Sequence, residues 1–123
     1  MPDMIDHIVI GASDLAASKA FYERALAPLD IQVVLEFPGV VGFGAQRKPE
    51  LWLREGGGRE PVHVALRSPD RATVDAFHAA ALEAGGRDNG AAGVREIYHP
   101  HYYGAFVLDP DGHNLEAVCH EPG

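Results

Sequence analysis

The sequence predicts an α+β fold built from two copies of one βαβββ unit. The stretch that opens at His7 is repeated without a gap from His63, at a constant offset of 63 − 7 = 56 residues. Each copy begins with an alternating strand pattern and continues into a helical pattern. Short segments rich in β-branched residues then follow, separated by Gly and Pro turn signals. These observations favour two related modules that pack together within one domain.

The first module is expected at about 1–55. Ser13 and Asp14 can cap its helix, in which Ala17, Phe21 and Ala25 form one apolar stripe at i, i+4 spacing. The predicted elements are a strand at 5–10, a helix at 15–29, and strands at 31–37, 40–44 and 50–54. Glycines 56–58 mark a linker at about 56–61.

The second module is expected at about 62–121. Ser68-Pro69-Asp70 is a helix start with Ser at the cap, and Gly85-Gly86 is a helix end. Asp109-Pro110-Asp111-Gly112 is a strong turn signal before the last strand. The predicted elements are strands at 62–67, 94–98, 102–108 and 113–119, with the helix after the first of them.

Charge and composition restrict the classes of partner. The net charge is −8 and Lys and Arg form no cluster, so nucleic acid and anionic membranes are not expected partners. No apolar run reaches the ~18 residues that a membrane span needs. The single cysteine, Cys119, cannot form an intrachain disulfide and favours a reducing, cytoplasmic location.

Two histidines and one glutamate form the candidate metal site. His7 and His63 hold equivalent positions in the two modules, so we expect them to face one another across a shared cavity. Leu115 and Ala117 suit helix packing, which turns Glu116 to the opposite face of the strand. Two imidazoles and a carboxylate suit a divalent ion such as Fe, Mn, Ni, Co or Zn. The alternative is two core histidines and a carboxylate at a strand end.

Other residues are candidates to contact a substrate or to move protons. Trp52 aligns with Glu116 at an offset of 116 − 52 = 64 and either walls a substrate pocket or packs in the core. Asn114 shares a strand face with Glu116, and the neighbouring His113 contacts substrate or packs in the turn. His101 and Tyr103, in a segment dense in His and Tyr, are candidate acid–base residues, or else part of a surface loop.

The chain resembles the vicinal oxygen chelate superfamily, which includes glyoxalase I, extradiol dioxygenases and bleomycin-resistance proteins. Four parts of the chain carry the resemblance: 6–10, 14–15 with 21–22, 62–65 and, most specifically, 106–116, which reads FVLDPDGHNLE. It implies paired βαβββ modules whose mixed sheets curl round a metal cleft, and often a homodimer, sometimes with modules exchanged between chains. His7, His63 and Glu116 match three metal-ligand positions, whereas Trp52 stands where glyoxalase I-like members carry a Glu.

Two functions follow from these expectations. The first is a metal-dependent lyase or dioxygenase whose ion chelates two neighbouring oxygens of a small-molecule substrate. The second is a metal-free protein that binds a drug or small metabolite in the same cleft, as bleomycin-resistance proteins do; the aromatic Trp52 favours this alternative.

Overall fold

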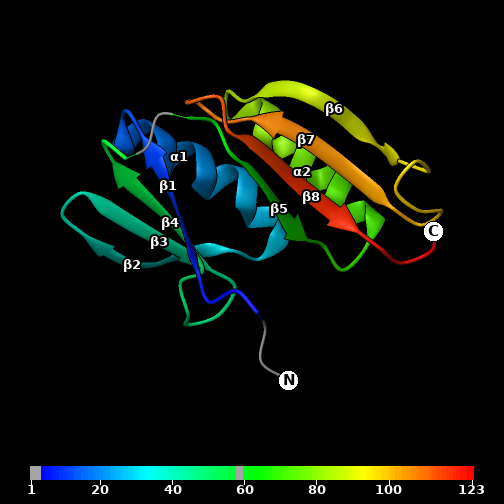
Figure 1. Ribbon diagram of the computed structural model, residues 1–123, viewed down its shortest axis with the longest axis horizontal. Coiled ribbons are helices and arrows are strands. Elements are labelled where there is room, and N and C mark those ends of the chain that lie inside the picture. Colours follow the sequence, from blue (N-terminus) through cyan, green and yellow to red (C-terminus); the bar gives the residue numbers. More distant parts are fainter. Residues whose placement is uncertain (1–3, 58–59) are drawn as a thin grey trace.

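The computed structural model describes residues 4–57 and 60–123, and it contains two four-stranded sheets with one α-helix against each (Figure 1). The first module comprises β1 (Ile8–Ala12), α1 (Leu15–Leu26), β2 (Gln32–Phe37), β3 (Val40–Gly44) and β4 (Leu51–Glu55). The second comprises β5 (His63–Arg67), α2 (Arg71–Glu83), β6 (Arg87–Val94), β7 (Tyr103–Leu108) and β8 (Asn114–Cys119). The predicted order βαβββ, twice, is confirmed. Of the predicted linker, residues 58 and 59 lie outside the described residues.

The two sheets share one topology and one register. Their strand orders are β1-β4-β3-β2 and β5-β8-β7-β6, with one parallel pair in each. Val9 pairs with Trp52 in the first sheet, and Ala65 pairs with Glu116 in the second. The offsets of 56 and 64 residues inferred from the sequence are therefore the structural equivalences, and Trp52 occupies the place of Glu116.

One hydrophobic core joins the modules. It includes Tyr22 and Phe43 from the first module and Phe77 and Leu115 from the second, each less than 2% exposed. Asp14 and Asp70, again 56 residues apart, are the N-caps of the two helices and accept hydrogen bonds from backbone amides three residues on. The second helix begins at Arg71, after Pro69, so its cap is Asp70 and not Ser68. The first helix ends at Leu26, and a 3-10 turn (Ala27–Leu29) completes the predicted span.

The strand expected at 94–98 is wrong, and β6 takes its place in the sheet. Ile97 is 86% exposed in a turn, whereas the Gly-rich segment Arg87–Val94 pairs with β7 through two register shifts. Gly has low strand propensity and leaves no alternation to detect. The Arg95 guanidinium supports this edge strand by donating to the carbonyls of Ala91 and Gly93 at 2.6 and 2.9 Å.

The turn before β8 ties the modules together. Asp109 accepts a 2.6 Å hydrogen bond from the buried Tyr22 hydroxyl on α1. His113, 2% exposed, accepts from the Val62 amide at 3.1 Å through Nδ1 and donates to the Gly11 carbonyl at 2.9 Å through Nε2. The end of β1 therefore meets the start of β5.

The edge strands β1 and β5 run in roughly opposite directions (Figure 1), and a groove of ≈ 560 Å³ lies between them. The groove is lined by Ile8 from the start of β1 and by Leu66 and Arg67 from the end of β5. The two sheets therefore stay separate in the described part of the chain and do not close on one another. This antiparallel arrangement decides where the site residues lie.

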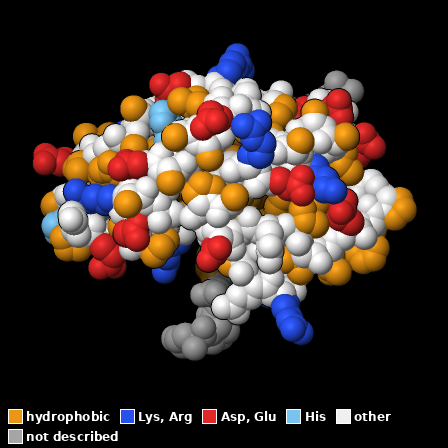
Figure 2. Space-filling view, turned by 180° about the vertical axis from the view of Figure 1, so that it is seen from behind, with side chains coloured by type: hydrophobic (Ala, Val, Ile, Leu, Met, Phe, Trp, Pro, Cys, Tyr) orange, Lys and Arg blue, Asp and Glu red, His pale blue; other side chains and the backbone are white. Residues whose placement is uncertain are grey.

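The surface carries mixed charge. On the face seen in Figure 2, Lys and Arg side chains are scattered among Asp, Glu and hydrophobic side chains and form no continuous patch. No helix in residues 4–57 and 60–123 is long and apolar enough to cross a membrane.

Candidate functional site

The centre of the candidate site is Glu116, a fully buried carboxylate in the middle of β8. Leu115, Ala117 and Cys119 point into the core, so strand alternation turns Glu116 to the opposite face of the sheet. There its Oε1 accepts a 2.7 Å hydrogen bond from His63 Nε2. The expected face of Glu116 and its pairing with His63 are thus present in the structure.

Tyr102 is the second partner of Glu116, and its hydroxyl donates to Oε2 of that carboxylate. The phenol ring makes T-shaped contacts with the mutually stacked rings of His99 and His120, whose centroids are 5.5 and 5.4 Å away. A side chain at Gly104 would come within 3.1 Å of both Glu116 Oε2 and the Tyr102 ring, so glycine makes room for this contact. Burial and the Glu116 carboxylate raise the pKa of Tyr102 well above its usual range, which keeps its proton in place.

Asn114 adds an unpaired acceptor to the same face. It pairs directly with His63 in the sheet register, and its Oδ1 atom is buried with no hydrogen-bond partner among the described residues. Buried polar atoms are nearly always satisfied in native proteins. The Asn114 oxygen is therefore an unsatisfied buried acceptor beside His63, and its contact with substrate stays a prediction.

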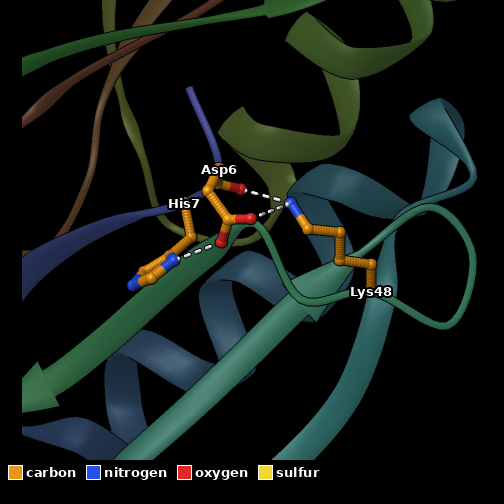
Figure 3. Close-up of polar contacts among 3 residues, drawn as sticks. All are labelled: Asp6, His7 and Lys48. Atoms are coloured by element: carbon orange, nitrogen blue, oxygen red, sulfur yellow. Dashed lines mark hydrogen bonds and ion pairs between the residues drawn. The ribbon is translucent and has the colours of Figure 1, made fainter. Parts of the chain in front are cut away.

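His7 lies just before β1 and is oriented by its neighbours (Figure 3). Its Nδ1 donates to Asp6 Oδ1 at 2.6 Å, while Lys48 Nζ lies 2.6 Å from the Asp6 carbonyl oxygen and 3.3 Å from Oδ2. The hydrogen bond from His7, followed by Lys48, lowers the pKa of Asp6. Nε2 of His7 is left with its lone pair, as a metal ligand requires.

The structure does not bring His7 to His63 and Glu116 within one chain. His113 joins the start of β5, where His63 lies, to Gly11, and His7 is four residues, or about 13 Å, back along β1 from Gly11. In residues 4–57 and 60–123, no three His, Cys, Asp or Glu side chains are close enough together to hold an ion. The expectation that equivalent positions face one another fails because β1 and β5 run in opposite directions.

A single chain consequently offers an incomplete ligand set. His63 Nε2 and Glu116 Oε1 are two metal-ligating atoms on one face, whereas catalytic sites typically use three protein ligands. The residues of one chain therefore do not fit a catalytic metal ion without a further ligand.

Three other predicted residues lie away from Glu116. Tyr103 faces α2, where its hydroxyl donates to Asp75 Oδ1 at 2.6 Å and the Arg71 guanidinium lies over its ring. His101 is exposed in the turn before β7. His113 is a buried link between the modules.

Tyr102 is the residue that the sequence reasoning missed. Phe106 pairs with Glu116 in the sheet, so Gly104 and Tyr102, at two and four residues before it, continue the same face. Tyr103 belongs to the alternate set that packs on α2. Strand alternation counted back from the last strand pair would have identified the correct phenol.

Trp52 lies in a pocket of ≈ 680 Å³ on the open face of the first sheet. His7, Val9 and Arg54 also line this pocket. Trp52 therefore faces a cavity and is not part of the main core, and its contact with a substrate stays a prediction.

Comparison with known proteins places this arrangement in a family. A model of the Glyoxalase/Bleomycin resistance protein/Dioxygenase superfamily matches residues 4–117. No curated protein matches the sequence.

Solved structures show the same fold. A glyoxalase/bleomycin resistance protein from Albidiferax ferrireducens T118 is 24% identical, with a TM-score of 0.82 over 97% of this chain and 100% of that one. A lactoylglutathione lyase from Agrobacterium tumefaciens is 22% identical, with a TM-score of 0.74 over 97% and 95%. The oxidase ChaP-H2 is 22% identical, with a TM-score of 0.71 over 100% and 98%. Since the family model covers nearly the whole sequence, the chain belongs to the glyoxalase/bleomycin resistance protein/dioxygenase superfamily.

Proposed function

We propose that the protein is a metal-dependent enzyme of the glyoxalase/dioxygenase type, a lyase or dioxygenase acting on a small molecule with two neighbouring oxygens. The observation that carries this proposal is Glu116, a fully buried carboxylate paired with His63 on the sheet face away from the core. A carboxylate in that position is costly to bury, and a divalent ion would balance its charge.

His7 is the third ligand in this proposal. Histidines that bind metals almost always donate their other ring N–H to a carboxylate or carbonyl, which fixes the tautomer and the ring orientation. His7 makes this contact with Asp6, and Lys48 in turn balances the charge of Asp6. His7 Nε2 is thereby prepared to bind a cation.

A second copy of the chain completes the site in our proposal. A two-fold dimer that sets the first sheet of one copy against the second sheet of the other brings His7 of one to His63 and Glu116 of the other, twice. Beside its pocket, the open face of the first sheet carries the exposed apolar residues Leu35 and Phe37, at 44% and 56% exposure. Such residues are suited to contact between subunits.

The chemistry divides between the ion and the chain. A bound Fe, Mn, Ni, Co or Zn ion would polarise two vicinal oxygens of the substrate as a Lewis acid. Tyr102 holds one oxygen of Glu116, leaving the other for the site, and Asn114 Oδ1 accepts a hydrogen bond from the substrate. Tyr102, and not Tyr103, lies at the site, and its retained proton positions the Glu116 carboxylate through their hydrogen bond.

The test is metal content by elemental analysis of untagged protein purified without chelators. We expect about one ion per chain, lost in His7→Ala and in Glu116→Ala. An equal mixture of these two variants, unfolded and refolded together, forms one intact site in each mixed dimer. Random pairing then restores about a quarter of the wild-type metal. Recovery of none would contradict a site shared between chains.

A metal-free binding protein is the second candidate. Trp52 replaces a ligand position and presents an aromatic surface to a pocket of ≈ 680 Å³, which suits binding by stacking. Wild-type protein that takes up no metal even after reconstitution would favour this candidate over the enzyme.

A further inference from the structure

The pocket on the open face of the first sheet has an apolar floor and polar ends. Val9 and Trp52 lie side by side in the register of β1 and β4 and form the floor. His7 lies two residues before Val9, and Arg54 lies two residues beyond Trp52, so they occupy opposite ends. Each end is about 7 Å from the middle at the rise of a strand.

The floor is a fixed, flat surface. A Cβ atom built at Gly42 would lie 2.9 Å from Cη2 of Trp52, so the indole lies directly over this glycine. Phe37 stacks on the indole with ring centroids 6.4 Å apart and planes inclined by 18°. A rigid indole held in this way favours ligands that are themselves planar, because the contact area between flat rings is large.

Arg54 brings an unbalanced positive charge to one end. Within residues 4–57 and 60–123 no carboxylate forms an ion pair with it, whereas Asp6 at the other end is paired with Lys48 and His7. Glu55 also lines the rim, but as the next residue along the strand it points to the other face, and no ion pair among the described residues joins it to Arg54. Arg54 is exposed, and its partner in the register is Gly11.

We infer that this pocket binds a planar carboxylate, with its conjugated ring on Trp52 and its carboxylate on Arg54. The guanidinium matches a carboxylate with two parallel hydrogen bonds. The opposite end of the molecule then points toward His7. The assignment of this ligand class to the substrate rests on the proposed function, whereas binding of the carboxylate itself does not require a metal.

Trp52 is the only tryptophan in the chain, so its fluorescence reports directly on the pocket. We would titrate chelator-treated full-length protein with benzoate, with its neutral isostere benzamide, and with cyclohexanecarboxylate, which has the charge without the flat ring. Benzoate should quench the emission with a Kd of about 1 mM, a reasonable affinity for so small a ligand. The other two should bind about tenfold more weakly, since each lacks one of the two contacts.

Substitutions test whether benzoate binding depends on the Arg54 guanidinium itself or only on the net charge of the protein. Arg54→Gln should weaken benzoate binding by about tenfold and leave benzamide unchanged, while Arg54→Lys should fall between it and wild type. Arg24→Gln removes the same charge from the exposed end of α1 and should have no effect. Calorimetry on Trp52→Leu should show that benzoate binding is lost.

Two results would overturn the inference. One is equal affinity for benzoate and benzamide, and the other is equal weakening by Arg54→Gln and Arg24→Gln. Benzoate that binds only to metal-loaded protein, independently of Arg54, would also overturn it while leaving the proposed enzyme intact. The protein could instead take up no metal and still bind benzoate in a way that is weakened by Arg54→Gln. That result would support the planar-carboxylate pocket and contradict only the proposed function.

Discussion

Tyr102 and Tyr103 are consecutive residues whose hydroxyl groups lie on opposite faces of the second sheet. The Tyr102 hydroxyl donates to the buried carboxylate of Glu116, and the Tyr103 hydroxyl donates to Asp75 on the exposed side of α2. Both interactions are phenol–carboxylate hydrogen bonds, so the pair offers a matched comparison between a buried site and a solvent-exposed one.

Tyr102→Phe should destabilise the protein more than Tyr103→Phe. Without Tyr102, Oε2 of the fully buried Glu116 has no donor, which costs about 1–3 kcal/mol of the free energy of unfolding. The Asp75 carboxylate is exposed and regains water, so Tyr103→Phe should cost less than about 1 kcal/mol. Urea unfolding of the two variants measures the difference. Equal losses would show that Glu116 does not depend on Tyr102.

Strand alternation explains why part of this site was predictable. The apolar residues Leu115 and Ala117 determined the face of Glu116, and the repeat offset placed His63 on the adjoining strand. Both inferences require only the two-residue alternation of side chains along a strand and the pairing of neighbouring strands, which can be inferred from the sequence. The same rule, applied backward from Phe106, selects Tyr102 over Tyr103.

The relation between the modules was not predictable in this way. Sequence repetition shows that His7 and His63 are equivalent, but two equivalent strands that pack together can run in the same or in opposite directions. Here His113 joins the end of β1 to the start of β5, so the equivalent histidines are at opposite ends. Strand β6 was missed for a similar reason. The Arg95 side chain stabilises it by hydrogen bonds to backbone carbonyls, and such bonds leave no pattern of hydrophobic residues in the sequence.

Tyr22→Phe should make the stability of the protein less sensitive to alkali. Burial, with the neighbouring Asp109 carboxylate, raises the pKa of Tyr22 well above its usual value of ~10. Above pH ~10, the Tyr22 hydroxyl loses its proton in the unfolded chain but keeps it in the folded chain. The free energy of unfolding therefore falls by about 1.4 kcal/mol per pH unit through this group.

Urea unfolding between pH 9 and 12 measures this slope. The variant should lose about 1–3 kcal/mol at neutral pH, because Oδ2 of Asp109 lacks its donor while Oδ1 keeps two backbone amides. The pH dependence of its free energy of unfolding should then be shallower by one proton. Identical slopes in wild type and variant would mean that Tyr22 ionises equally in both states.

His113→Ala should act on stability and not on metal content. The substitution leaves the Val62 amide and the Gly11 carbonyl without their shared partner, at a cost of about 2–4 kcal/mol. His101→Ala, in an exposed turn, is the control and should change stability by less than about 0.5 kcal/mol. Thermal unfolding with elemental analysis of the folded fraction measures both effects. Loss of metal from stable, folded His113→Ala protein would instead assign this residue to the ligand site.

Trp52→Glu should tighten metal binding. Trp52 pairs with Val9 as Glu116 pairs with Ala65, so the substitution puts a carboxylate in the same relation to His7 that Glu116 has to His63. The added ligand would raise the number of protein ligands in the proposed site from three to four. Trp52→Gln is the matched control, since it leaves the same space over Gly42 without adding charge. Titration with Co²⁺, followed by its visible absorption, should give a lower Kd for Trp52→Glu than for Trp52→Gln. Equal Kd values in the two variants would mean that position 52 does not reach the ion, and that His7 and Trp52 serve the ligand pocket alone.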